Sequence, residues 1–282
     1  MPLVAQHAGA WIPPLLERSE RPPSPAMPRL YLSGFDALAD ELGAPRVPSF
    51  PALLLGDLSL VTEAPEDYGV REAEMSAWRP SEDLCWPTTR FVYTGPIFAR
   101  LDRPISPPVE AALRREGSIV YVAMTSAPAD LVRAAVREVA SAGAEVVVAA
   151  TMDDLSDLAG PRVAVGGILP SHRIAPRVAL AVTTGGQGSL QNAMAAGTPV
   201  IGIPLQPEQE ANLRWLEGAG AARSLPPESL GQGVLAGLVR ETLATPGYRL
   251  GAQRIAAAYA QRDGPGLSAE AILHYLAPGD RQ

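Results

Sequence analysis

The stretch that decides the fold is residues 182–209, VTTGGQGSLQNAMAAGTPVIGIPLQPEQ. An apolar run at 179–182 leads into a glycine-rich turn, and a second apolar run occupies 199–203. Between them, the residues from Ser189 to Gly197 are expected to form a short helix. The order strand, turn, helix, strand is the repeating unit of a parallel sheet.

Three glycines give the turn its predicted chemistry: Gly185, Gly186 and Gly188. Such a turn brings bare backbone N–H groups and the positive end of a helix to one place, which suits a phosphate group. Glu208 and Gln209 follow the next strand and leave the sheet at the same edge. Their acceptors and donors match sugar hydroxyls. Phosphate and sugar groups side by side predict a nucleotide-sugar site.

The same pattern of strands and helices extends along the chain. Further strands are expected at 118–123, 145–150, 162–165 and 221–225. Further helices are expected at 129–142, 208–217, 228–244 and 248–261. Strands that are apolar throughout and separated by helices indicate a parallel sheet covered on both faces. We therefore predict a doubly wound, Rossmann-like α/β domain over residues 118–263.

The N-terminal part, residues 1–95, has a different character. A helix is expected at 29–42 and a strand at 58–61, which is too little to close a sheet, so we predict a partial domain. The proline-rich segment 96–117 is predicted to be a linker. Residues 264–282 are expected to form a C-terminal helix and tail.

Composition excludes several classes of protein. A formal net charge of -7 and a pI near 5.1 argue against a nucleic-acid-binding surface. Lysine is absent, so neither Schiff-base nor P-loop lysine chemistry is available. Cys85 is the only cysteine, which excludes a disulfide within the chain. The N-terminus does not resemble a signal peptide and every apolar stretch is interrupted, so we expect a soluble, cytoplasmic protein without a membrane span.

The quoted motifs resemble a known family. The strings TTGGQGS (183–189) and AAGTPVIGIP (195–204), followed by the Glu208–Gln209 pair, are similar to the donor-binding signature of nucleotide-sugar glycosyltransferases with the GT-B fold. The bacterial macrolide-type branch is the most similar. Upstream, residues 93–96 (YTGP) resemble the segment between the two GT-B domains, and residues 121–126 resemble the first strand and serine loop of the donor domain.

The resemblance implies a function and a set of site residues. The function is metal-independent, inverting transfer of a hexose from a UDP- or dTDP-sugar to a small-molecule hydroxyl acceptor, with the nucleotide-sugar as co-substrate and no other cofactor. The implied donor-binding residues are Ser126, Leu169, Pro170, Thr184, Gly185, Gly186, Gln187, Gly188, Ser189, Asn192, Glu208 and Gln209. The acidic run 153–157 could suggest a metal site, but Gly160 and Pro161 follow it, and we expect a solvated loop that binds no metal.

The sequence departs from the family pattern at three points. Thr184 stands where the family has a histidine, and Asn192 stands where it has an acidic residue. Roughly the first hundred residues of a GT-B acceptor domain have no counterpart here, and the family's catalytic histidine lies among them. None of His7, His172 and His274 occupies a matching position, so we name no catalytic residue. A protein partner or an upstream segment is the candidate source of the missing acceptor domain.

Two other interpretations stay open at this point. The chain could be a non-catalytic or partner-dependent subunit that binds the donor without turnover. It could also be an NAD-binding oxidoreductase, because Gly186-x-Gly188 precedes a helix and Glu208 lies roughly twenty residues further on. Against the second interpretation, Gln191 occupies the place of the third glycine of that fingerprint.

Overall fold

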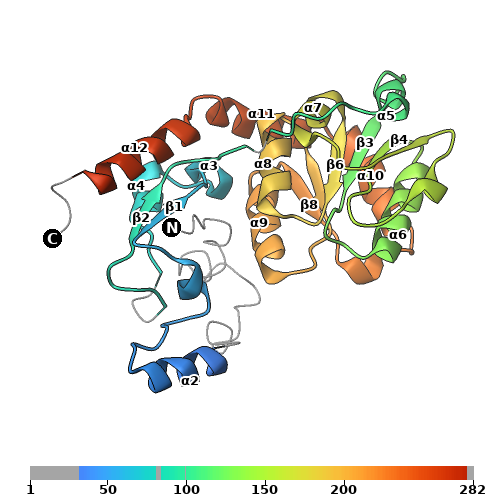
Figure 1. Cartoon of the computed structure of the whole chain (residues 1–282). Helices are drawn as coiled ribbons and strands as arrows, with labels where there is room; N and C mark the ends of the chain where they lie inside the picture. Colours follow the sequence, from blue (N-terminus) through green and yellow to red (C-terminus); the bar gives the residue numbers. More distant parts are fainter. Residues whose placement is uncertain (1–31, 81–83, 99, 278–282) are drawn as a thin grey trace. The chain divides into compact units, whose positions relative to one another are not determined.

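The computed structural model describes residues 32–80, 84–98 and 100–277 (Figure 1). The chain divides into two compact units. The first comprises the described parts of Met1–Pro65, Val70–Ile97 and Arg262–Gln282, and the second comprises Glu66–Gly69 and Phe98–Gln261. His7 and the first residues of the helix expected at 29–42 lie outside the described residues.

The second unit is built on a six-stranded sheet in which all neighbouring strands are parallel. Its strands are β3 (Ile119–Ala123), β4 (Glu145–Ala149), β5 (Val163–Gly166), β6 (Leu180–Thr183), β7 (Val200–Gly202) and β8 (Ala222–Ser224). They lie in the order β5-β4-β3-β6-β7-β8. The order reverses between β3 and β6, as in a dinucleotide-binding sheet. This confirms the predicted doubly wound α/β architecture.

Helices cover both faces of this sheet (Figure 1). The α-helices of the unit are α5 (Pro107–Ala112), α6 (Ala129–Ser141), α7 (Ser171–Ile174), α8 (Gln187–Ala195), α9 (Pro207–Gly218), α10 (Val234–Ala244) and α11 (Pro246–Tyr259). Short 3-10 turns are η4 (Ser156–Leu158), η5 (Ala175–Arg177) and η6 (Pro227–Ser229).

Two of the helix boundaries that differ from the sequence prediction are explained by glycines. Helix α8 begins at Gln187 and not at Ser189, because Gly186 with its extended backbone serves as the N-cap and Gly188 is accommodated in the first turn. The helix expected from residue 228 begins only at Val234, since Gly231 and Gly233 adopt left-handed φ values of 86° and 78° that interrupt it.

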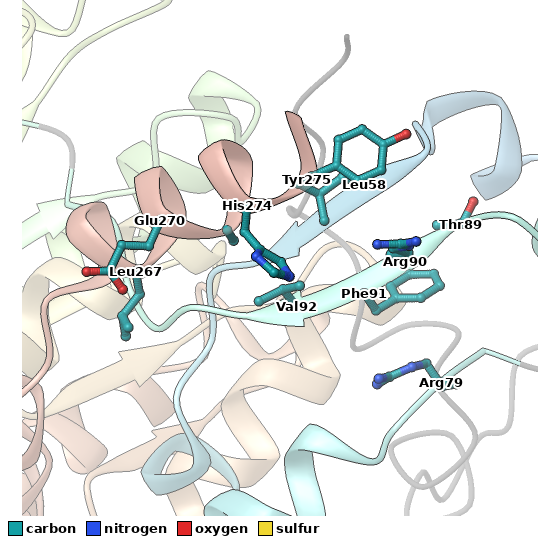
Figure 2. A pocket seen from close by; sticks show the side chains of 11 residues that line it. Leu58, Arg79, Thr89, Arg90, Phe91, Val92, Leu267, Glu270, His274 and Tyr275 are labelled. Atoms are coloured by element: carbon teal, nitrogen blue, oxygen red, sulfur yellow. The ribbon is translucent and has the colours of Figure 1, made fainter. Parts of the chain in front are cut away.

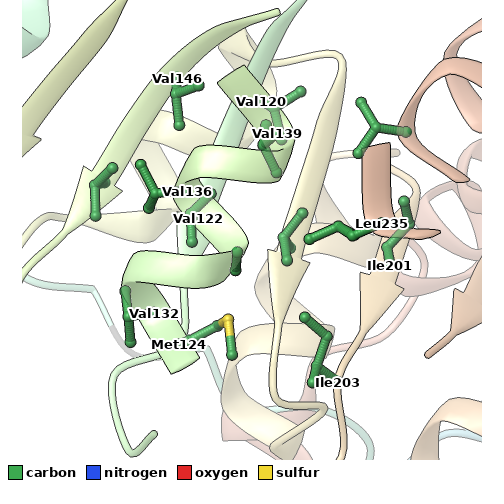
Figure 3. Packing of buried hydrophobic residues seen from close by; sticks show 14 of the residues in the cluster. Val120, Val122, Met124, Val132, Val136, Val139, Val146, Ile201, Ile203 and Leu235 are labelled. Atoms are coloured by element: carbon green, nitrogen blue, oxygen red, sulfur yellow. The ribbon is translucent and has the colours of Figure 1, made fainter. Parts of the chain in front are cut away.

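Each face of the sheet has its own core. Figure 3 shows α6 and α10 packed on one face, where Val120, Val122, Ile201 and Leu235 meet. On the other face, the alternate residues of β3 and β4 pack together with Ala164 of β5 against α5 and α7. Because both faces are covered, the central strands are apolar at nearly every position, and this is the pattern visible in the sequence; the exceptions are at strand ends, such as Glu145 and Thr183, and in the edge strand β8, which contains Arg223 and Ser224.

Helix α5 lies in the segment that the sequence presented as a linker. Pro107 and Pro108 occupy its first turn, where the missing N–H groups cost nothing, and Val109 and Ala112 are fully buried against β4 and β5. Residues from Phe98 onward therefore belong to the second unit, which differs from the linker boundary of 96–117.

A buried carboxylate joins α6 to α10. Glu138 lies on α6 and is 7% exposed. Its two oxygens accept hydrogen bonds from the backbone N–H groups of Gly231 (2.5 Å), Leu235 (2.8 Å) and Ala236 (3.3 Å). A negative charge at a helix N-terminus interacts favourably with the helix dipole, so Glu138 caps α10 from another element.

The first unit contains, among its described residues, the parallel pair β1 (Leu58–Val61) and β2 (Arg90–Tyr93). Its helices are α2 (Ser33–Leu42), η3 (Pro51–Leu54), α4 (Glu72–Ser76) and α12 (Gly264–Leu276), and α3 (Pro65–Tyr68) begins in it. Helix α12 belongs here because Gly264 lies directly against the chain at Gly95 and Pro96: a Cβ on Gly264 would be 2.3 Å from the Pro96 carbonyl oxygen.

One contact fixes the start of α9 on the sheet. Leu213 is fully buried and fills the space left by Gly185, which follows β6, and by Gly202 in β7. A Cβ on Gly202 would lie 2.1 Å from Leu213 Cδ1, and one on Gly185 would lie 2.7 Å from the same atom. The two glycines therefore determine how closely α9 can approach.

We predict that Gly202→Ala lowers the free energy of unfolding by about 2 kcal/mol, because the new methyl group overpacks the contact with Leu213. Urea denaturation measures the change. Gly237→Ala in α10 is the matched control: a Cβ there meets nothing within 4 Å, and the change should be neutral or stabilise by up to about 1 kcal/mol. Equal effects of the two substitutions would contradict the packing argument.

Candidate functional site

The candidate site lies at the carboxyl ends of β3, β6 and β7. In parallel strands these ends share one edge of the sheet, and ligands of such folds bind where the strand order reverses. Ser126 lies in the exposed turn after β3, the glycine turn follows β6, and Glu208 stands in the first turn of α9 after β7. The topology thus brings three sequence-predicted segments to the same edge.

Two adjacent glycines of the turn have different surroundings. Gly185 has a left-handed φ of 91° and is packed against Leu213 and the Gln209 carbonyl oxygen. Gly186 has φ -65° and ψ 141°, and a Cβ on it would meet nothing within 4 Å, as is also true of Gly188. Gly185 therefore serves the fold, whereas Gly186 and Gly188 leave the outer side of the turn open.

The open side of the turn coincides with the N-terminus of α8. Within the described ranges no side chain caps this helix at Gly186, and the first backbone bonds of the helix run from the N–H groups of Ser189 and Leu190 to the Gly186 carbonyl. The amides of the first turn and the helix dipole are therefore directed toward the space in front of Gly186 and Gly188. Such an arrangement attracts an anion.

Several predicted residues lie behind this surface. Thr184 is only 4% exposed. Gln209 is buried, and its Oε1 accepts a 2.8 Å hydrogen bond from the Leu205 N–H, which fixes the loop before α9. Leu169 packs on Gly166 and Pro170 is buried, so these two residues can meet a ligand through their backbone rather than their side chains.

Other predicted residues lie nearer to solvent. Gln187, Ser189 and Asn192 are half-buried on α8, and the Asn192 amide nitrogen donates to the Gly188 carbonyl at 2.8 Å. Ser126 is exposed, and it does not cap α6, whose N-cap residue is Pro128.

Glu208 is linked to the glycine turn through a residue that the sequence reasoning missed. The Asn212 amide nitrogen donates to Glu208 Oε1 at 2.8 Å and to the Gly185 carbonyl at 3.2 Å. The only signal in the sequence was the i, i+4 spacing of Glu208 and Asn212, which places them on one face of a helix.

The two histidines within the described residues belong to different units of the chain. His172 stands on α7 after β5, and its Nδ1 atom is buried without a hydrogen-bond partner in the described part of the chain. His274 lies on α12 in the first unit.

The acidic run is an exposed loop, as its sequence predicted. Asp157 pairs with Arg133, and the hydrogen bond from this guanidinium lowers the pKa of the Asp157 carboxyl. The backbone N–H of Ser156 lowers the pKa of Asp154 in the same way. Among the described residues, no group of histidine, cysteine and acidic side chains has the arrangement of a metal site.

A groove of about 680 Å³ lies within the first unit, where α12 faces β2 (Figure 2). Its lining residues are Leu58, Arg79, Thr89, Arg90, Phe91, Val92, Leu267, Glu270, Ala271, His274 and Tyr275. The Arg90 guanidinium lies 5.7 Å from the centre of the Tyr275 ring. The groove touches β1 only at Leu58, its first residue, and runs along β2 from Arg90 to Val92.

None of the helices within the described ranges has both the length and the apolar character that a bilayer crossing requires.

Comparison with known proteins identifies the protein family and the fold of this chain. The family model described as "Erythromycin biosynthesis protein CIII-like, C-terminal domain" matches residues 133–273, half of the chain. The fold resembles that of the kitacinnamycin glycotransferase, with a TM-score of 0.63 and 20% identity over 86% of this chain and 60% of that one. The calicheamicin glycosyltransferase gives a TM-score of 0.61, also with 20% identity. The architecture is that of the GT-B glycosyltransferases, and the chain belongs to the erythromycin biosynthesis protein CIII-like family.

Curated relatives match different lengths of the chain. A "PGL/p-HBAD biosynthesis glycosyltransferase" of Mycobacterium tuberculosis is 38% identical over 95 residues, which are 34% of this chain and 22% of that protein. The "4'-demethylrebeccamycin synthase" of Lentzea aerocolonigenes is 27% identical over 232 residues, which are 81% of this chain and 53% of that protein. The chain therefore matches only part of the length of these relatives.

The two neighbouring glycines should respond differently to alanine. Gly185→Ala is expected to destabilise the fold by about 3 kcal/mol, because it combines a left-handed φ with a clash against Leu213. Gly186→Ala should change the free energy of unfolding by no more than about 0.5 kcal/mol. Thermal and urea unfolding of both variants provide the check, and a large loss for Gly186→Ala would show that the turn is not open.

Proposed function

We propose that this chain transfers a hexose from a UDP- or dTDP-sugar to a hydroxyl group of a small natural-product-like acceptor. The supporting observation is the open glycine turn at the N-terminus of α8, connected through Asn212 to an acidic residue of the next helix. Membership of the erythromycin biosynthesis protein CIII-like family supports the same reaction class.

The proposed donor site has three parts. The backbone amides of residues 186–188 and the Ser126 hydroxyl bind the diphosphate, since the Ser189 amide already donates to the Gly186 carbonyl within α8. Asn192 binds the ribose, and the backbone at Leu169 and Pro170 meets the base. Glu208 and Gln209 bind the hexose; because Gln209 Oε1 already accepts from Leu205, its amide nitrogen is the group left to donate.

The proposed reaction is a single inverting displacement. The acceptor oxygen loses its proton to a general base and forms a bond to the anomeric carbon, while the bond to the diphosphate oxygen breaks and leaves its electron pair on the diphosphate. The amides and the dipole of α8 stabilise the charge that develops there, a role that requires neither a metal nor a further cofactor. The general base must lie within hydrogen-bond reach of the acceptor oxygen, and we propose that a partner or an upstream segment supplies it.

A second candidate function is a donor-binding subunit that needs a partner for turnover. The observation that favours it is the small sheet of the first unit, where the described residues form only two strands. Transfer assays with the chain alone and with a candidate partner chain distinguish the two functions: turnover by the chain alone would rule out the subunit.

Nucleotide binding tests the proposal directly. Isothermal titration of the wild-type chain with UDP, dTDP and NAD should give binding of at least one pyrimidine diphosphate and none of NAD. Gly186→Leu should weaken that binding at least roughly 100-fold while the protein remains folded, because the side chain fills the open space that the diphosphate needs. Unchanged affinity would refute the site, and binding of NAD alone would favour an oxidoreductase.

The sugar-binding role of Glu208 has its own test. Glu208→Ala should raise the dissociation constant for UDP- or dTDP-glucose roughly 10-fold, since a hydrogen bond to a charged group is lost, and should leave the affinity for free UDP or dTDP nearly intact. Titration of wild type and variant with both ligand types measures the two dissociation constants. Equal losses for nucleotide and nucleotide-sugar would contradict the assignment.

A further inference from the structure

We infer that the hydrogen bond between the hydroxyl groups of Tyr121 and Ser171 positions the loop of residues 167–170, which meets the base of the nucleotide in the proposed donor site. The inference rests on the proposed function and adds to it a contact that holds this base loop in place. Tyr121 and Ser171 are positioning residues, because they act through the loop and need not touch the nucleotide.

The hydrogen bond joins two elements that are two strands apart in the sheet. The side-chain oxygens of Tyr121 and Ser171 are 3.1 Å apart. Tyr121 is the middle residue of β3, whereas the base loop leaves β5 at Gly166, and β4 lies between these strands. The base loop therefore carries the chain to β3, one of the two strands between which the sheet order reverses and ligands of such folds bind. Helix α7, which begins where the loop ends, packs against α8.

The backbone of the base loop is available to a ligand. In the part of the chain that the structure describes, the N–H and C=O groups of Gly167, Ile168 and Leu169 form no hydrogen bond. Gly167 and Ile168 are also exposed. The edge of a uracil or thymine base presents an N–H donor and carbonyl acceptors, and backbone C=O and N–H groups match both kinds.

The two ends of the base loop are held in different ways. The Gly166 carbonyl accepts from the Ala150 N–H at 2.8 Å, which continues the pairing of β4 and β5. At the other end, Leu169 is 6% exposed and belongs to the same apolar cluster as Tyr121 and Ile174. Apolar packing is non-directional, so it limits the movement of the loop without fixing its orientation. The Tyr121–Ser171 hydrogen bond supplies the directional contact at this end.

The Tyr121 hydroxyl can be removed without changing the packing of its ring. Tyr121 is 3% exposed, and burial raises the pKa of its phenol, so the hydroxyl stays neutral. Tyr121→Phe would keep the ring in the core and remove the contact with Ser171, and the base loop would then sample several orientations. A buried hydroxyl also requires a partner for stability alone, so binding and stability have to be measured separately.

Titration of the full chain with UDP and dTDP tests the inference. Tyr121→Phe and Ser171→Ala should each weaken the nucleotide that binds wild type roughly 10-fold, because the base loop loses its directional contact. The double variant should lose no more than either single variant, since both substitutions break the same hydrogen bond. Additive losses would overturn the inference, as would wild-type affinity in both single variants. Ser171 is only half-buried, so Ser171→Ala serves if Tyr121→Phe does not fold.

Thr198→Val is the matched control. The fully buried Thr198 hydroxyl donates to the Ala175 carbonyl at 2.7 Å and so holds the chain just after α7, at the end away from the base loop. The substitution should make the chain less stable to urea, because a buried carbonyl loses its donor, and should leave nucleotide affinity within roughly 2-fold of wild type. If Thr198→Val weakened the nucleotide as much as Tyr121→Phe, a general loosening around α7 would explain both losses and the inference would fail.

Amide hydrogen exchange reports on the base loop itself and separates the inference from its foundation. Saturating nucleotide should slow exchange at Gly167 and Ile168 at least roughly 10-fold in wild type, and much less in Tyr121→Phe. Nucleotide binding by wild type without this protection would remove the inference and leave the proposed function standing. If the wild-type chain bound neither UDP nor dTDP, the proposed function itself would fail, and the inference with it.

Discussion

The structure of the site depends on one contact, the Leu213 side chain between Gly185 and Gly202. Two positions without side chains, one at the end of β6 and one in β7, allow a helix to approach the sheet closely. Because α9 packs this closely on the sheet, its first turn lies at the edge of the sheet where α8 begins. A methyl group at either glycine would push the helix outward, and the carboxylate and the turn would separate. The polar geometry of the site is thus set by an apolar contact.

The strands of the sheet are well predicted from the sequence, because each one is visible as a short run of consecutive apolar residues. Strands covered on both faces are apolar at nearly every position, so β3, β4 and β6 are visible as runs of valine, leucine and alanine. The sequence also predicted that a glycine turn would be followed by a short helix. The start of α8 was not, because its N-cap is a glycine and no side chain marks the boundary.

Features that depend on partners distant in the sequence escaped prediction. A glutamate in the middle of a helix, such as Glu138, usually indicates an exposed face, and its donors lie far along the chain. Two prolines made α5 look like a linker, although the first turn of a helix accepts them. Asn212 was missed for a similar reason: its spacing from Glu208 was visible, but the carbonyl of Gly185 became a partner only when α9 docked.

The cap on α10 has a consequence for synthesis of the chain. The donors to the Glu138 carboxylate come from residues 231–236, close to the end of the second unit. While the ribosome has yet to deliver that segment, burying the charged group of α6 would leave it without partners at a cost of several kcal/mol. We therefore expect α6 to dock on the sheet only after residues 231–236 have been synthesised.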